Sequence, residues 1–328
     1  MIKNPRLFFY GDLRLIVMLL GENMNAIKSA GALLAALAYL PAQTWAAPVL
    51  GPQLSDFAVL GAAAVTNTGP TSLIGSLGVS NNTSATGITG FFGTLANDGP
   101  GVASGAIHQG GAVALTADQQ LSIAMLSLGL LGPGTALGAS LNGLALAPGV
   151  YTVDAAVTNL TGTLTLDGGG NANAYWVFKS SSTLITSSGS TMKVIDTGPG
   201  AGVYWDVGSS ATLGSNSTFV GNILASASIS MNNGVSVTCG RALAHIGAVT
   251  MIADVVNAGD CKGSDVAGSH GLSGGLTMPE GGGVPLPLPF SPVAVVPEPG
   301  PLSLYAAGLA ALFVWKRKKA AGSLKQRH

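Results

Sequence analysis

Five short segments in the middle of the chain share one pattern, and this pattern constrains the fold more than any other feature. Each segment sets one aliphatic residue between small or hydroxylated neighbours: Thr161–Thr165, Ser182–Thr186, Ala211–Gly214, Ser226–Ser230 and Gly247–Thr250. Successive side chains of a β-strand point to opposite faces. The aliphatic residues therefore point one way and the hydroxylated residues point the other way.

The aliphatic residues recur at steps of 20, 29, 16 and 20 residues, being Leu164, Leu184, Leu213, Ile229 and Val249. This spacing predicts stacked strands with about 20 residues in each coil of a repeat protein. The step of 29 requires an insertion, for which Asp196–Gly200 is suited. Gly221–Leu224 and Gly240–Leu243 repeat at 19 residues and predict a second face.

One stretch, from about Ile107 to Leu131, lacks strand alternation. Thr116–Gln119 matches a capping box, and Leu121, Met125 and Leu128 share one face at helical spacing. We therefore expect a helix that covers one side of the strands, although Gly110 and Gly111 disfavour its first turns.

The charge distribution excludes a nucleic-acid partner. Only 9% of the residues are charged, against roughly 25% in a typical protein. The stretch between Pro48 and Val296 contains four Lys or Arg residues and eleven Asp or Glu residues, so its net charge is −7. Nucleic-acid binding needs a basic surface, which this stretch lacks.

The N-terminal region has the layout of an export signal. In residues 24–46, Lys28 precedes an apolar run from Ala30 to Leu40, and Thr44–Ala46 fits a signal-peptidase site. Residues 1–23 fit poorly before this signal and favour a true start at Met24. The alternative is a genuine N-terminal extension.

The C-terminal region, residues 297–328, carries three further signals. Pro297, Glu298 and Pro299 are followed by an apolar run, Leu302–Trp315, and a basic cluster, Lys316–Lys319. The run is marginal for a transmembrane segment, which usually needs about 17 residues. The arrangement resembles a PEP-CTERM sorting signal, which implies cleavage by an exosortase and a cell-surface or extracellular location. A plain membrane anchor is the alternative.

The two cysteines, Cys239 and Cys261, predict one disulfide if the protein is exported, and two buried thiols otherwise. Residues 263–296 are rich in Gly and Pro and are interpreted as a linker. The folded domain is therefore expected to span residues 47–262.

Several segments, in order along residues 54–257, resemble the ice-binding-like family of bacterial and fungal antifreeze proteins: Phe57–Gly61, Val65–Thr71, Gly75–Val79, Leu146–Tyr151, Leu160–Asp167 and Gly240–Ala244. The resemblance implies a mainly β fold, an irregular right-handed β-helix (a β-solenoid of triangular section) with one long α-helix packed alongside. It also implies ice binding by an outward Thr/Ser/Ala-rich face. The candidate residues are Thr161, Thr163, Thr165, Thr183, Thr212, Ser228, Ser230, Ala248 and Thr250. Of these, Thr163, Thr183, Thr212, Ser228 and Thr250 are expected to lie in one file across successive strands.

No arrangement of residues predicts an enzyme, a cofactor or a metal site. His108, His245 and His270 are far apart in sequence, and the chain has neither an HExxH motif nor a Gly-rich phosphate loop. Asp167–Asn171 is interpreted as a tight turn. The main alternative to ice binding is a matrix or adhesion protein that binds exopolysaccharide.

Overall fold

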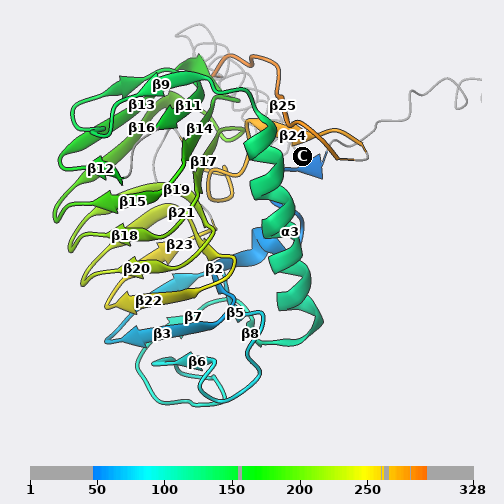
Figure 1. The fold of residues 1–328 in the computed structure, drawn as a ribbon, viewed down its shortest axis with the longest axis vertical. Coiled ribbons are helices and arrows are strands. Elements are labelled where there is room, and N and C mark those ends of the chain that lie inside the picture. The colour runs from blue at the N-terminus through cyan, green and yellow to red at the C-terminus, as the bar shows by residue number, and fades with distance from the viewer. Residues whose placement is uncertain (1–46, 154–156, 260, 262–265, 281, 294–328) are drawn as a thin grey trace, which may run out of the picture. The chain divides into compact units, whose positions relative to one another are not determined.

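The computed structural model describes residues 47–153, 157–259, 261, 266–280 and 282–293. These residues form a stack of short, mostly parallel strands with one long helix, α3 (Gly111–Leu130), along its side (Figure 1). The predicted signal peptide and sorting signal lie outside the described residues.

The strands of the stack form three rows, and three further strands form a small separate sheet. A seven-stranded parallel sheet is the first, in the order β12 (Val157–Leu160), β15 (Thr183–Thr186), β18 (Ala211–Leu213), β20 (Ile229–Met231), β22 (Ala248–Ile252), β3 (Ala64–Thr68) and β6 (Ile88–Thr89). Although β22 and β3 are adjacent, they are far apart in sequence.

The other two rows share a fifteen-stranded sheet, because β19 (Thr218–Ala225) and β21 (Ser236–Ala244) are long enough to belong to both. The helix-side row consists of β9 (Thr135–Leu137), β11 (Gly149–Val153), β14 (Tyr175–Ser180), β17 (Gly202–Val207), the second halves of β19 and β21, β2 (Phe57–Gly61), β5 (Ser76–Val79) and β8 (Ile107–Gln109). The third row consists of β10 (Ala145–Leu146), β13 (Thr163–Asn171), β16 (Thr191–Thr197), the first halves of β19 and β21, β23 (Val255–Asn257), β4 (Ser72–Ile74) and β7 (Val102–Ala103).

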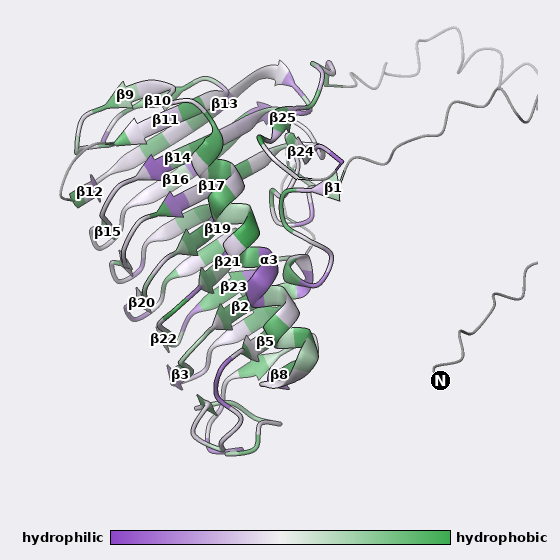
Figure 2. Cartoon of the chain, turned by 45° about the vertical axis from the view of Figure 1, so that its right-hand side comes forward, coloured by the Kyte–Doolittle hydropathy of each residue, from purple (hydrophilic) through white to green (hydrophobic). Residues whose placement is uncertain are grey.

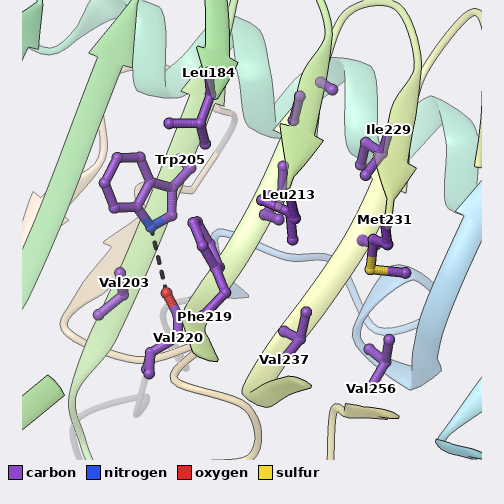
Figure 3. Close-up of a cluster of buried hydrophobic side chains, with 14 of the residues drawn as sticks. Leu184, Val203, Trp205, Leu213, Phe219, Val220, Ile229, Met231, Val237 and Val256 are labelled. Carbon is purple, nitrogen blue, oxygen red and sulfur yellow. Dashed lines mark hydrogen bonds between the residues drawn. The ribbon is translucent and has the colours of Figure 1, made fainter. Parts of the chain in front are cut away.

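The chain passes repeatedly from the helix-side row to the seven-stranded sheet and then to the third row, and one such pass is a coil. The aliphatic residues predicted to point inward are fully buried between the rows: Leu164, Leu184, Leu213, Ile229 and Val249. Figure 3 shows part of this core, where Trp205 Nε1 donates a hydrogen bond of 3.3 Å to the carbonyl of Val220. The predicted second repeat is confirmed, since Gly221 pairs with Gly240 and Leu224 with Leu243.

Glycine is required where β21 turns from the third row into the helix-side row. A Cβ on Gly240 would lie 1.8 Å from the Gly221 carbonyl oxygen, and Gly221 itself has a φ of +99°. Only glycine tolerates the close approach at Gly240 and the positive φ at Gly221. The next residue, Arg241, is buried and donates hydrogen bonds to Asn222 Oδ1 and to the carbonyls of Ser55, Ala258 and His270. Burial lowers the pKa of Arg241 to about 10.

Helix α3 packs on the helix-side row through a second apolar cluster. Ala117, Leu121 and Leu128 of the helix are fully buried there with Leu224 and Leu243 of the strands. His245 Nδ1 lies 3.1 Å from Asp118 Oδ1, and Lys179 donates hydrogen bonds to the carbonyls of Leu131 and Gly132.

The helix begins at Gly111, within the predicted stretch, but the capping-box match does not mark its start. Gly110, with a φ of +73° and no side-chain cap, precedes the first turn, so Thr116–Gln119 lies inside the helix and does not begin it. A glycine with positive φ turns the chain from β8 into the helix at the edge of the row, and tertiary packing supports the first turns in spite of their low helix propensity.

The predicted linker is partly packed onto the domain. After Cys239 and Cys261, which form the predicted disulfide, Leu272 enters the core and is fully buried. Strand β24 (Leu276–Met278) pairs with β1 (Ala47–Pro48) and with β25 (Leu286–Pro287). The boundary at residue 262 is therefore too early, because a few apolar residues are enough to anchor a Gly- and Pro-rich segment.

Candidate functional site

The outer surface of the seven-stranded sheet is the candidate site. Helix α3 covers the helix-side row and leaves this sheet free (Figure 1). Its strands pair without a register shift from β15 to β6. Regular pairing places outward side chains at about 4.8 Å from strand to strand.

One row of outward side chains runs across the whole sheet. The pairing aligns Asn159, Ile185, Thr212, Ser230, Thr250, Thr66 and Thr89. We call these seven residues the central file. They are exposed or half-exposed, while the residues beside them in the strands, such as Leu184, Ile229 and Val249, are buried.

A second file of outward side chains lies beside the central file and contains threonine, valine and alanine. Thr183 and Val157 are paired, as are Ala248 and Ala64. Ser228 joins the neighbouring strands, since its Oγ accepts a hydrogen bond of 3.2 Å from Ala248 N. None of the seven strands contains a charged residue, so the surface presents only hydroxyl, amide and methyl groups.

The sequence assigned the direction of the candidate residues correctly, since all nine are exposed or half-exposed: Thr161, Thr163, Thr165, Thr183, Thr212, Ser228, Ser230, Ala248 and Thr250. The structure divides them between two surfaces. Five belong to strands of the seven-stranded sheet and Ser228 lies directly before β20, but Thr163 and Thr165 lie on β13 in the third row, with Thr161 in the bend before it. A single file through Thr163, Thr183, Thr212, Ser228 and Thr250 was therefore a wrong prediction.

The error has a physical cause. Alternation fixes the face of a strand but not its register, and a slip of two residues leaves the facing unchanged. Leu184 pairs with Ala211, so Leu213 lies two positions beyond it. Sequence reasoning also missed Thr66 and Thr89, because nothing local shows that β3 follows β22 in the sheet.

The corner between this sheet and the third row is held by a buried carboxylate. Asp254, with no exposed surface, accepts hydrogen bonds from Val235 N at 2.7 Å and from Ile252 N at 2.8 Å. Burial raises the pKa of Asp254 to about 6, against the lowering effect of these backbone donors. His245, the histidine nearest to Asp254 in the sequence, contacts Asp118 of helix α3.

The remaining sequence candidates are structural. Asp167–Asn171, predicted to be a tight turn, belongs to strand β13 and contains its register shift, where Asp167 Oδ1 accepts a hydrogen bond from Gly169 N. Among the described residues, no group of three or more His, Cys, Asp or Glu residues is placed to hold a metal ion. Trp176, Tyr204 and Trp205 are buried, and so cannot form an exposed aromatic platform.

Comparison with known proteins gives a consistent set of relatives. Residues 59–257 match the family model described as Ice-binding-like. An ice-binding protein of Nostoc sp. (strain HG1) is 41% identical over 198 residues, which cover 60% of this chain and 69% of the relative.

Solved structures agree. The crystal structure of an ice-binding protein from the Antarctic ascomycete Antarctomyces psychrotrophicus matches with a TM-score of 0.58 and 32% identity, covering 67% of this chain and all of that one. An ice-binding protein from an Antarctic biological consortium matches with a TM-score of 0.57 and 31% identity, covering 66% of this chain and 94% of that one.

Proposed function

Because the chain belongs to the ice-binding-like family, we propose that it binds ice, and that it does so through the outer surface of the seven-stranded sheet. The observation that carries the assignment of the surface is the central file, in which hydroxyl groups from five adjacent strands follow one another: Thr212, Ser230, Thr250, Thr66 and Thr89.

The chemistry of this file suits an ordered water layer. Adjacent strands lie ~4.8 Å apart and alternate residues ~6.7 Å apart, so the side chains form a regular array. The threonine methyl group excludes water while the hydroxyl holds it, and branching at Cβ restricts χ1. A rigid array loses little conformational entropy when it binds. Charged groups, which would hold water in other geometries, are absent from these strands.

The array also limits the expected strength of the activity. Asn159 and Ile185 occupy two of the seven positions of the central file, and serine replaces threonine at Ser230. A shortened array covers less of an ice plane. The chain is therefore proposed to act mainly by slowing ice growth and recrystallisation, rather than by a large depression of the freezing point.

Family membership also supports a finer description of the fold. The three rows and the repeating path through them fit a right-handed β-solenoid of triangular section. In this description, each row is one side of the triangle and α3 lies along one of the three sides.

The site of action is proposed from the two ends of the sequence. Signal peptidase would release the chain near Ala46, and an exosortase would act near Pro297, Glu298 and Pro299. The mature protein would then lie at the cell surface or in the extracellular matrix. There it would lie among exopolysaccharide chains without binding them through Trp176, Tyr204 or Trp205, since these aromatic side chains are buried.

The direct test is to record ice crystals growing in the presence of the exported protein. We expect shaped crystals and small grains after annealing, at concentrations where a non-binding protein of similar size has no effect. Retention of the protein by an exopolysaccharide gel, with unchanged ice growth and grain size, would replace ice binding by a matrix function.

A further inference from the structure

Three polar residues form a continuous chain of hydrogen bonds along the corner between the seven-stranded sheet and the third row. They are Asp254, Thr71 and Asn67, and we call them the corner ladder. Asp254 N donates a hydrogen bond of 3.0 Å to Thr71 Oγ1, and the Thr71 hydroxyl donates to Asn67 Oδ1. Asn67 Nδ2 donates in turn to the carbonyl of Gly90 at 2.8 Å. Asp254 and Thr71 are buried, so these bonds are shielded from water.

The corner ladder joins four neighbouring coils of the stack. At one end, the carboxylate of Asp254 accepts the bond from Val235 N, in the coil that contains β20. Asp254 itself follows β22, Thr71 follows β3 and Gly90 follows β6. These four strands are adjacent in the seven-stranded sheet, and Figure 2 shows β20, β22 and β3 as neighbours in the stack. The ladder therefore crosses the strands in the same direction as the central file.

The same four strands carry hydroxyl side chains at every position of the central file. In the order β20, β22, β3 and β6, they contribute Ser230, Thr250, Thr66 and Thr89. Two of these directly precede a residue that the ladder holds, since Thr66 precedes Asn67 and Thr89 precedes Gly90. A change in the ladder is thus transmitted to the outward side chains through one peptide unit.

At the other end of the sheet, the described residues form no such ladder. There Thr186 Oγ1 accepts a hydrogen bond of 2.9 Å from Gly214 N, which is a single step between two coils. Ser190, in the same corner, is buried, and its hydroxyl has no hydrogen-bond partner in the described part of the chain. Here the central file contains Asn159 and Ile185 in place of hydroxyl side chains. The ladder and the unbroken hydroxyl file therefore occupy the same part of the sheet.

Backbone pairing alone does not make a sheet flat. Adjacent strands are usually rotated by about 20° relative to one another, which turns the outward side chains of a file away from a common plane. Flat sheets are typically stabilised by stacking or by specific side-chain ladders. The need is greatest at β6, a two-residue edge strand that pairs only with β3. The bond from Asn67 to Gly90 ties this strand to its neighbour.

We propose that the corner ladder positions the ice-binding surface, by holding the hydroxyl side chains of β20, β22, β3 and β6 in one plane. This rests on the proposed function, because a flat array matters only if the sheet binds a crystal. Asp254 and Thr71 are buried and cannot touch ice. They are positioning residues that act through the outward threonines of the strands that they link.

Thr71→Val in the full exported chain tests the ladder. Valine keeps the shape of threonine but removes the hydroxyl, so Asp254 N and Asn67 Oδ1 lose their partner. We expect the concentration needed to inhibit ice recrystallisation to rise several-fold. Thr71→Ser keeps the hydroxyl and should retain the activity. The matched control is Thr186→Val, which removes the hydroxyl of another buried threonine with two hydrogen bonds in this corner, outside the ladder.

Thermal unfolding and amide hydrogen exchange separate positioning from a general loss of stability. Both Thr→Val variants should lower the Tm by similar amounts, while only Thr71→Val should weaken the effect on ice. Val65 N donates to the carbonyl of Gly87 at 2.9 Å and so pairs β3 with the edge of the sheet. Edge strands exchange their amide hydrogens by local opening. Exchange at Val65 should therefore become faster in Thr71→Val and stay unchanged in Thr186→Val.

Full ice activity of Thr71→Val, or equal losses of activity in the two Thr→Val variants, would overturn the proposal. If Thr71→Val does not fold, Asn67→Ala takes its place, because Asn67 is half-buried and its amide holds Gly90. This variant should lose activity several-fold, and full activity would again overturn the proposal. Failure of ice binding itself is distinguishable, because the unchanged protein would then be inactive as well, which would overturn both proposals.

Discussion

The seven-stranded sheet and the third row are both left uncovered by α3, and both carry outward threonines, yet they differ in regularity and charge. In the third row, Thr163, Thr191, Thr218 and Ser236 form a file of their own. Beside it lie the exposed charged groups of Lys193 and Asp167. Composition alone therefore does not separate a candidate ice surface from an ordinary solvent-facing one.

Register separates the two surfaces more clearly. The third row has register shifts between Asp167 and Asn171 and again between Phe219 and Val220. Each shift bends the strand and breaks the spacing of the side chains. The seven-stranded sheet pairs without such shifts from β15 to β6. An array of side chains that has to match the surface of an ice crystal depends on this uninterrupted spacing.

The largest expected effect comes from a bulky group in the middle of the central file. Thr250→Tyr should raise the concentration needed to inhibit recrystallisation at least tenfold, because one ring lifts the neighbouring strands from the ice. Stability should change by less than about 0.5 kcal/mol, as is usual for exposed positions. The matched control is Thr218→Tyr in the third row. Equal losses in both variants would remove the distinction between the surfaces.

A second pair of variants tests the register itself. Thr66→Tyr changes a residue that the sequence did not assign to the site, whereas Thr163→Tyr changes one that it did. The structure places Thr66 beside Thr250 and Thr163 on the third row. We expect several-fold weaker ice shaping from Thr66→Tyr and little change from Thr163→Tyr. A larger loss of ice shaping from Thr163→Tyr than from Thr66→Tyr would instead support the single file that the sequence predicted.

A smaller effect concerns the corner that joins the two surfaces. The pKa of Asp254 is raised from its ordinary value of 3.8 to about 6, so the folded state holds this proton more tightly than the unfolded state does. Stability should therefore fall as pH rises from about 4 to about 6, by on the order of 2 kcal/mol. Urea unfolding at pH 4 and pH 7 measures this change.

Asp254→Asn is the control for the pH effect. The amide cannot ionise, so the part of the slope due to Asp254 should disappear, while the part due to Asp206, whose pKa is also raised to about 6 by burial, should remain. An unchanged slope in this variant would show that other groups cause the pH dependence.

The smallest expected effect is at Ala253, in the same corner. Its φ of +54° is unfavourable for alanine and natural for glycine. Ala253→Gly should stabilise the fold by about 0.5 kcal/mol, although glycine also gains freedom in the unfolded chain. Ala64→Gly, in the extended strand β3, should destabilise it. Thermal unfolding of the two variants should move in opposite directions.

The sequence predicted what is local in this molecule. Period-two alternation assigned Leu184, Ile229 and Val249 to the core and Thr212, Ser230 and Thr250 to the surface, as the structure confirms. The helix and the disulfide were also predicted. Each of these features depends on residues near one another or on a simple pairing rule.

What could not be predicted depends on contacts between distant segments. The pairing of Thr250 with Thr66 joins strands more than 180 residues apart, and no local pattern encodes it. Packing of Leu272 and Leu276 was hidden because each is a single apolar residue in a Gly-rich segment. The register between β15 and β18 was hidden because slips of two residues leave the facing unchanged.

The length of α3 has to match the length of the whole stack of strands. The chain winds through β2, β5 and β8 to one end, returns along α3, and restarts at β9 to wind back towards β2. An added coil lengthens the stack by ~4.8 Å, and the return helix, at ~1.5 Å per residue, must grow by about three residues to match. Longer proteins of this design, with a wider surface, therefore need paired insertions, one in the strands and one in the helix.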